Sequence, residues 1–245
     1  MSEPLAGRSV VITRSAAQNA NLRVLLEECG AHVVEMPLVS IEEPEDEGRE
    51  RDAMLQQLHT FDWLVVTSPN GADRVAPFLA AAGAAADSPV FPRLAAVGAA
   101  TARMLGVHTD LVAEPARASV LAEMFPRGAG RVLLVQGNLA DDGFAAAIGD
   151  RGWNVTKVVA YRTVSVMPDD ASRAPALAAD VLMLASGSAA SAWFDAFGTE
   201  TPAVVVSIGP STTRVAEQLG IHVTATAEEQ NLGAMIRTAA NSIGA

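Results

Sequence analysis

Aromatic side chains and cysteine are both scarce in this sequence. Of its 245 residues only 4% are aromatic, with a single tyrosine, and Cys29 is the one cysteine. A lone cysteine excludes an internal disulfide and fits a reducing compartment. Since 50% of the residues are hydrophobic, a sizeable core is expected, built from small aliphatic side chains. The length allows one domain or two of ordinary size.

Long uncharged runs are also missing. The longest is the stretch of 14 residues from Val181 to Phe194, which is shorter than the roughly 18 to 20 residues of a membrane-spanning helix. The segment Met1–Arg14 has no basic leader followed by an apolar stretch of signal-peptide length. We therefore expect no membrane helix and a cytoplasmic protein.

Basic residues are outnumbered by acidic ones. Lys and Arg total 17 against 28 Asp and Glu, a formal net charge of −11. Surfaces that bind nucleic acids are normally basic, because they face phosphates. The composition therefore predicts no nucleic-acid partner.

What the sequence does contain is a regular alternation of short apolar runs and helical stretches. The runs are rich in β-branched residues and lie at Val10–Thr13, Ala31–Val34, Trp63–Val66, Leu94–Val97, Thr109–Val112, Val132–Val135, Val155–Ala160, Val181–Leu184, Ala203–Ile208 and His222–Thr224. Nearly continuous apolar strands indicate burial on both faces, so the sheets should be parallel with helices on each side. The pattern predicts an α/β protein.

A weak internal repeat indicates two similar domains. The strand–loop–helix–Gly–strand unit from Ile12 to Val33 recurs 122 residues later, from Leu134 to Val155. Two further pairs match Asp62–Ser68 with Asp180–Ser186 and Ala96–Arg103 with Ser207–Arg214. The order of these units predicts a discontinuous first domain, residues 1–36 plus 167–245, and an inserted second domain, residues 42–159. Segments 37–41 and 160–166 should form a two-stranded connector.

Ligands of parallel α/β sheets bind at the carboxyl ends of the strands, where loops lead into helices. Backbone N–H groups and short hydroxyls at such helix starts bind anions, and glycine lets a ligand approach the backbone. The same residue types also serve as ordinary helix caps. Because six such loops could share one cleft between two domains, we take these residues as candidates for substrate binding: Arg14, Thr67, Ser68, Asn70, Gly71, Gly98, Thr101, Gly137, Asn138, Ser186, Gly187, Ser188, Gly209, Pro210, Ser211 and Thr212.

No motif for a metal or cofactor is apparent. The four histidines show neither an HExxH pattern nor a Cys/His ligand spacing. No GxGxxG follows a predicted strand, and there is neither a P-loop nor a GxSxG elbow. We expect no metal and no cofactor.

The ordered set of loops resembles the uroporphyrinogen-III synthase family over nearly the whole chain. The matching segments are Val11–Arg14, Leu38–Ile41, Asp62–Gly71, Ala96–Gly98 with Thr101, Val132–Leu134 with Gly137, Val159–Thr163, Ser186–Ser188 and Ile208–Thr212. The sequence departs from the family pattern at Gln136 and Ala185.

The resemblance implies a fold, a reaction and a set of roles. It implies two flavodoxin-like α/β domains joined by a two-stranded connector. The implied reaction converts hydroxymethylbilane to uroporphyrinogen III, with loss of water and inversion of ring D through a spiro intermediate, and it needs no cofactor. The family's important tyrosine maps onto Tyr161 as the catalytic residue, and its pocket threonines map onto Thr101 and Thr212. We expect a monomer, with hydroxymethylbilane synthase as a transient partner.

Two other functions remain open from the sequence. One is a non-catalytic tetrapyrrole-binding or regulatory module of the same fold; the chain ends at Ala245 without a basic tail, which disfavours regulation through DNA. The other is a two-domain binder of sugars or anions. For the synthase reaction, a net charge of −11 would repel a substrate with eight carboxylates. The cleft should therefore be lined by backbone N–H groups and hydroxyls, with most acidic side chains facing away.

Overall fold

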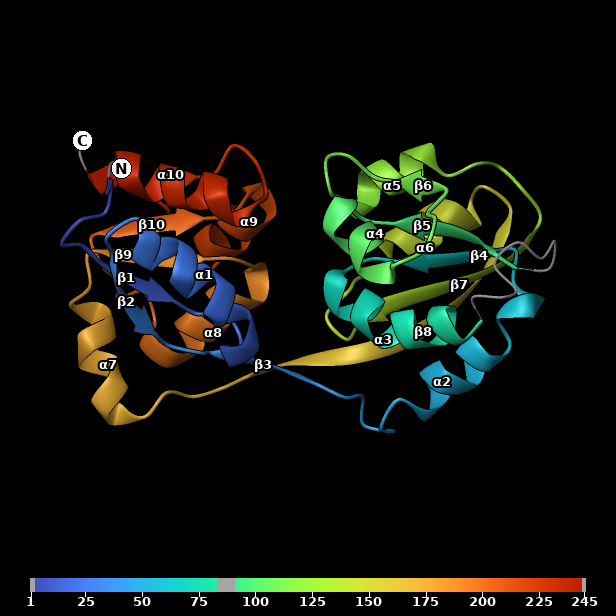
Figure 1. The fold of residues 1–245 in the computed structure, drawn as a ribbon, viewed down its shortest axis with the longest axis horizontal. Coiled ribbons are helices and arrows are strands. Elements are labelled where there is room, and N and C mark those ends of the chain that lie inside the picture. Colours follow the sequence, from blue (N-terminus) through green and yellow to red (C-terminus); the bar gives the residue numbers. More distant parts are fainter. Residues whose placement is uncertain (1–2, 83–90, 244–245) are drawn as a thin grey trace. The chain divides into compact units, whose positions relative to one another are not determined.

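The computed structural model describes residues 3–82 and 91–243. The chain divides into two compact units (Figure 1), the first containing the chain up to Ser40 and again from Val164, and the second Ile41–Thr163. The two crossing points lie within segments 37–41 and 160–166.

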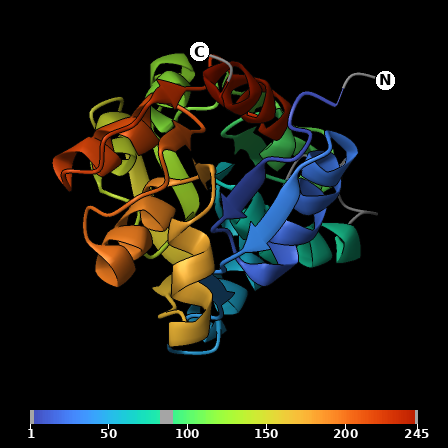
Figure 2. The same ribbon diagram turned by 90° about the vertical axis from the view of Figure 1, so that its left-hand side faces the viewer.

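The first unit is a five-stranded sheet between two layers of helices. Neighbouring strands are all parallel, in the order β11 (Ala225–Thr226), β10 (Val204–Ser207), β9 (Val181–Leu184), β1 (Ser9–Ile12) and β2 (His32–Glu35). Its helices are α1 (Ala16–Glu28), α7 (Asp170–Leu177), α8 (Gly187–Phe197), α9 (Pro210–Gln218) and α10 (Leu232–Ile243). Figures 1 and 2 show α7 and α10 on opposite sides of this unit.

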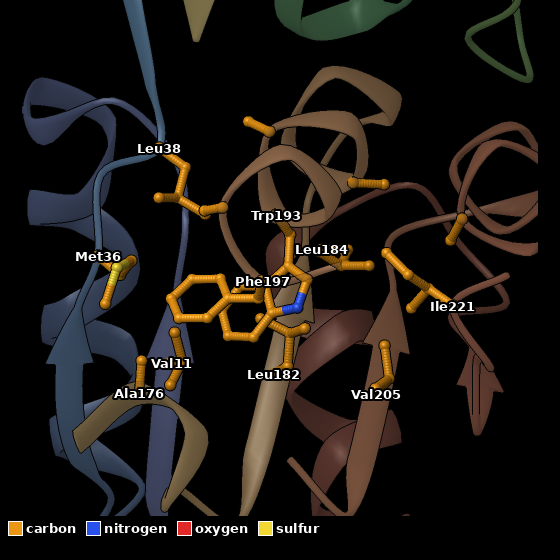
Figure 3. Close-up of a cluster of buried hydrophobic side chains, with 14 of the residues drawn as sticks. Val11, Met36, Leu38, Ala176, Leu182, Leu184, Trp193, Phe197, Val205 and Ile221 are labelled. Carbon is orange, nitrogen blue, oxygen red and sulfur yellow. The ribbon is translucent and has the colours of Figure 1, made fainter. Parts of the chain in front are cut away.

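Alternate strand residues build a separate core on each face of this sheet. Val11, Leu182 and Val205 pack with α7, α8 and α9, whereas their neighbours along the strands pack with α1 and α10. The rings of Trp193 and Phe197 stack at 4.2 Å between centroids and lie at the centre of the first cluster (Figure 3). Because both faces are covered, all the residues of β9 are apolar and buried.

The second unit has a six-stranded sheet with the same layering. The strand order is β3 (Val39–Glu42), β8 (Trp153–Ser165), β7 (Gly130–Gly137), β4 (Trp63–Val66), β5 (Arg93–Ala96) and β6 (Leu111–Val112), and the pairs from β8 to β6 are parallel. One face packs against α2 (Arg49–Gln56), a 3₁₀ turn (Leu58–Thr60), α3 (Pro69–Ala81) and α4 (Ala99–Leu105). The other face packs against α5 (Ala118–Met124) and α6 (Gly143–Gly149).

The α/β class with parallel sheets is confirmed, but the last predicted strand is wrong. Residues His222–Thr224 are not a strand; β11 begins at Ala225. The Thr224 side chain explains the shift, because its hydroxyl accepts from the Val205 N–H at 3.0 Å. Regular pairing with β10 therefore begins only after Thr224, between Val206 and Ala225.

The acidic segment after β3 is held by arginines. Arg162 contacts Glu42 at 3.4 Å and Glu45 at 3.0 Å, and Glu43 bridges Arg51 and Arg74 at 2.7 and 3.0 Å. These contacts fix the start of the second unit against β8 and α3.

Candidate functional site

A cavity of about 350 Å³ lies in the second unit at the carboxyl ends of β4, β7 and β8. Its walls combine hydroxyls, backbone and a few apolar groups: Thr67, Ser68, Ala118, Gln136, Gly137, Leu139, Ala140, Asp141, Phe144, Tyr161 and Thr163. Four of these residues, Thr67, Ser68, Gly137 and Tyr161, belong to the set predicted from sequence. Parallel strands bring them together because their carboxyl ends meet at one edge.

Tyr161 supplies the phenol hydroxyl of this cavity and lies against Gly137. The residue is 9% exposed. A Cβ placed on Gly137 would lie 2.7 Å from the Tyr161 Cζ and 2.8 Å from its hydroxyl oxygen, so only glycine leaves room for the ring. Among the residues that the structure describes, none is hydrogen-bonded to the Tyr161 hydroxyl, which leaves it available to a ligand.

A β-bulge places Tyr161 opposite Gly137. Gln136 pairs with Val159 and Gly137 pairs with Tyr161, so Ala160 is an extra residue in β8. Bulges of this kind turn a side chain out of the regular alternation and are frequent beside active sites. The direction of the Tyr161 side chain therefore depends on a local break in the ladder.

Asn138 acts on the backbone around Tyr161. Its N–H donates to the Tyr161 carbonyl at 3.1 Å, and its side-chain Oδ1 accepts from the Thr163 N–H at 2.8 Å. Because the side-chain oxygen of Asn138 already accepts this hydrogen bond, the side-chain NH₂ group is the part of the amide that a ligand could use. Asn138 was predicted as a substrate contact and does not line the cavity.

The Thr67–Gly71 loop combines a cavity wall with a helix cap. The Thr67 hydroxyl donates to the Val135 carbonyl at 3.3 Å, and Ser68 Oγ accepts from the Gly71 N–H at 3.1 Å. Ser68 is thus the N-cap of α3, followed by Pro69 at its first position. Gly71 is buried beside Val66 and does not line the cavity, and Asn70 lies in the first turn of the helix.

Gly98 and Thr101 lie at the end of β5, outside the lining of this cavity. Gly98 has φ +85°, a conformation that favours glycine, and is the N-cap of α4. Thr101 is fully buried, and its hydroxyl donates to the Val97 carbonyl at 2.8 Å. In this structure the Thr101 hydroxyl serves the start of the helix.

The first unit carries the remaining predicted residues at the carboxyl ends of β1, β9 and β10. Ser186 Oγ accepts from the Ala189 N–H at 3.1 Å and lies 2.9 Å from the Ser188 hydroxyl, with Gly187 between them as the first residue of α8. Gly209 is the N-cap of α9 and Pro210 its first residue.

The remaining residues predicted on these loops differ in how far they are exposed to solvent. Ser211 is exposed and Thr212 is 3% exposed. Arg14 is half-buried between β1 and α1, and burial lowers the pKa of its guanidinium. In the described part of the chain no ion pair joins Arg14 to a carboxylate.

Several cavity residues had no signal in the sequence. Phe144 sits at a repeat position equivalent to the core residue Leu22, and Ala118 and Leu139 carry no polar group.

A chain of hydroxyls in the first unit also had no signal in the sequence. Beside β10, the hydroxyl oxygens of Ser207 and Thr213 lie 2.6 Å apart, and those of Thr213 and Thr226 also lie 2.6 Å apart. Its members come from three separate elements, so no local motif marks it.

Charge is sparse around the cavity. Of the described residues that line it, Asp141 alone is charged, and its Oδ1 accepts from the Gly143 N–H at 2.9 Å. Within residues 3–82 and 91–243 there is no group of three or more His, Cys, Asp or Glu side chains suited to hold a metal. Over the same residues no helix has the length and hydropathy required to cross a membrane.

Comparisons with known proteins agree on one family. A family model described as uroporphyrinogen-III synthase HemD matches residues 20–237. The chain is 34% identical over 199 residues to the chloroplastic uroporphyrinogen-III synthase of Oryza sativa subsp. japonica, covering 76% of this chain and 64% of that protein. It is 32% identical over 178 residues to the uroporphyrinogen-III synthase of Synechococcus elongatus, covering 69% and 66%. The matched regions thus span about two thirds of the length of these relatives.

Solved structures give the same fold at lower identity. A mutant uroporphyrinogen III synthase from the extremely thermophilic bacterium Thermus thermophilus has a TM-score of 0.68 and 20% identity, with 97% of this chain and 99% of that chain covered. The uroporphyrinogen-III synthetase of Helicobacter pylori has a TM-score of 0.60 and 17% identity, with 96% and 98% covered. Since the family model matches most of the sequence, this chain belongs to the uroporphyrinogen-III synthase family.

Proposed function

We propose that this protein is a uroporphyrinogen-III synthase. It would cyclise hydroxymethylbilane to uroporphyrinogen III in tetrapyrrole biosynthesis, the route to haem, sirohaem and cobalamin, with loss of water and inversion of ring D. Membership of the family supports this activity. The observation that carries the chemical role is the Tyr161 hydroxyl in the cavity, which has no hydrogen-bond partner among the described residues and lies over Gly137.

In the proposed reaction Tyr161 assists the first bond cleavage. Its O–H donates to the oxygen of the hydroxymethyl group, the C–O bond breaks and the oxygen leaves as water. The attached pyrrole loses its N–H proton and becomes an azafulvene. That proton, passed through solvent, replaces the one that Tyr161 gave to the leaving oxygen, so the net change is the loss of one water. Ring D is held so that its already substituted carbon attacks first, giving the spiro intermediate from which the inverted ring D arises.

The cavity suits a reaction in which geometry contributes most. Hydroxymethylbilane also closes unaided to the uninverted isomer, so the protein must select one folded conformation rather than supply strong acid or base. Neutral walls at Thr67, Ser68 and Phe144 favour a pyrrole ring over its carboxylate side chains, because desolvating a carboxylate without a partner is costly. The acetate and propionate groups would then point away from this cavity.

Substrate binding is proposed for all the binding residues predicted from the sequence, and different observations support different members of the set. Thr67, Ser68 and Gly137 line the cavity with Tyr161. Arg14, at the carboxyl end of β1, is a half-buried cation without a carboxylate partner in the described residues, which suits a substrate carboxylate. The loops at Ser186 and Gly209 would add hydroxyls and backbone N–H groups.

The proposal also includes the domain division, the location, the oligomeric state, the cofactor requirement and a partner. Residues 1–36 with 167–245 and residues 42–159 would act as domains, joined through 37–41 and 160–166. The protein would act as a cytoplasmic monomer without cofactor, and would meet hydroxymethylbilane synthase transiently. The transient contact is proposed because a substrate that cyclises spontaneously benefits from rapid transfer between the two enzymes.

The isomer composition of the product tests the activity. Hydroxymethylbilane is added to the purified full chain, the products are oxidised, and the type I and type III porphyrins are separated. We expect type III product formed faster than the spontaneous reaction. Type I alone, at the spontaneous rate, would contradict the synthase and favour a non-catalytic tetrapyrrole-binding module.

A further inference from the structure

The bulge that directs Tyr161 leaves one backbone carbonyl outside the regular pairing with β7. Ala160 is the extra residue of β8 between the pairs Gln136–Val159 and Gly137–Tyr161, and it is fully buried. A buried carbonyl needs a hydrogen-bond donor, because an unsatisfied one costs free energy. The donor must come from outside the β7–β8 ladder.

Arg51 of α2 is that donor. Its Nη1 donates to the Ala160 carbonyl at 2.9 Å across 109 residues of sequence. The Arg51 side chain is only 8% exposed, which is unusual for a guanidinium and calls for partners. It therefore connects α2 directly to the backbone next to Tyr161.

Two carboxylates hold the guanidinium in this position. Arg51 Nη1 lies 2.7 Å from Glu43 Oε2, and its Nε lies 2.7 Å from Asp52 Oδ1. Burial lowers the pKa of Arg51, but hydrogen bonds and charge interactions with the two carboxylates more than offset this and raise it. A Cβ on Gly48 would overlap the Arg51 guanidinium, so the glycine at the start of α2 makes room for it.

We propose that Arg51 is a positioning residue of the reaction: by holding the Ala160 bulge from one side, while Asn138 holds the backbone from the other, it fixes the direction of the Tyr161 hydroxyl. Arg51 does not line the cavity and takes no part in substrate contact. The inference rests on the proposed function for its effect on turnover, but the link between Arg51 and Tyr161 is a property of the protein without substrate.

A double-mutant cycle separates positioning from a general structural effect. We expect Arg51→Met to lower kcat about fivefold with KM changed less than about twofold, since binding groups are untouched. In a Tyr161→Phe background the same substitution should change kcat less than about twofold, because the hydroxyl that it positions is gone. Equal losses of kcat in both backgrounds would overturn the proposal.

Arg74→Met is the matched control. Arg74 shares Glu43 with Arg51 and also binds Asp73, but among the described residues its hydrogen bonds go to these two carboxylates and not to Ala160. Arg74→Met should leave kcat unchanged in each background, at the wild-type value alone and at the Tyr161→Phe value in the double variant. If Arg74→Met lowers kcat as much as Arg51→Met, the ion-pair cluster acts only through stability and the inference fails.

A readout without substrate keeps this test independent of the proposed activity. Tyr161 is the only tyrosine, so ¹³C-tyrosine labelling gives NMR ring signals from this residue alone. We expect Arg51→Met to shift and broaden these signals and Arg74→Met to leave them in place. Arg51→Lys keeps a cation beside Glu43 and serves where the Met variant is poorly folded. Its one nitrogen cannot occupy the positions of both Nε and Nη1, from which Arg51 makes its three contacts, so the signals should still shift. Unmoved signals in folded Arg51 variants overturn the proposal, whereas a wild type without type III product would refute only the synthase activity.

Discussion

The Asp180 carboxylate accepts two hydrogen bonds from Ser9, which lies 171 positions away in the sequence, at the point where their neighbouring strands begin. Asp180 Oδ2 accepts from the Ser9 N–H at 2.8 Å and from its hydroxyl at 2.7 Å. The second unit repeats this arrangement, since Asp62 Oδ2 accepts from the Arg131 N–H at 2.8 Å. In both halves of the chain, an aspartate directly before one strand thus binds the backbone at the beginning of the adjacent parallel strand.

Asp180→Asn should lower the free energy of unfolding by about 1 kcal/mol at pH 7, a modest value because the side chain is 36% exposed. The backbone N–H of Ser9, followed by its hydroxyl, lowers the pKa of Asp180. A carboxylate with a lowered folded-state pKa stabilises the protein above its unfolded pKa of about 3.9, and this contribution is lost as the pH falls through the folded value.

Urea unfolding between neutral and acidic pH measures both effects. The difference in stability between wild type and Asp180→Asn should shrink below about pH 4. A difference that stays constant into that range would show that the lost hydrogen bonds do not involve the ionised carboxylate.

Tyr161→Phe should lower kcat about tenfold while type III product is still formed, because one neutral hydrogen bond and modest acid assistance are removed. Steady-state rates with isomer analysis give the result. The unfolding midpoint serves as the control and should stay close to wild type, since no described residue is hydrogen-bonded to the hydroxyl. Unchanged turnover would remove Tyr161 from the mechanism.

Gly137→Ala should lower kcat at least about tenfold with a smaller effect on KM, because the new Cβ would displace the Tyr161 ring and its hydroxyl. The distance of 2.7 Å from that Cβ to Cζ is far below contact. Gly149→Ala is the matched control, since a Cβ at Gly149 meets nothing within 4 Å. Similar kinetics for both alanine variants would mean that the position of the ring is unimportant.

Trp193→Ala should lower the free energy of unfolding by about 3–5 kcal/mol through a cavity in the core of the first unit. The indole is fully buried and stacks on Phe197, and its Nε1 donates to the Glu200 carbonyl at 2.9 Å. Trp193→Phe retains a ring and should cost less. Denaturant unfolding monitored by circular dichroism compares the two, and equal losses would place the energy in the Nε1 hydrogen bond rather than in packing.

The sequence alone was informative wherever the structure depends on local pattern. The apolar runs Trp63–Val66 and Val181–Leu184 predicted buried strands, and both are strands with these bounds. Ser68 before Pro69 marked the start of a helix through capping chemistry. The resemblance singled out Tyr161, and the structure places it in a cavity. Local pattern failed at His222–Thr224, where a side-chain hydrogen bond delays the strand.

Tertiary structure alone determined how the cavity is assembled around Tyr161. The bulge at Ala160 arises from the register between β7 and β8, and its partner Arg51 lies on a helix far away in the chain. The room for the phenol comes from Gly137 on another strand. Periodicity and capping are set by neighbours within a few residues, so a sequence displays them. The tertiary structure decides which carbonyl lies outside the ladder and which side chain binds it, because both depend on contacts between segments that are distant in the sequence.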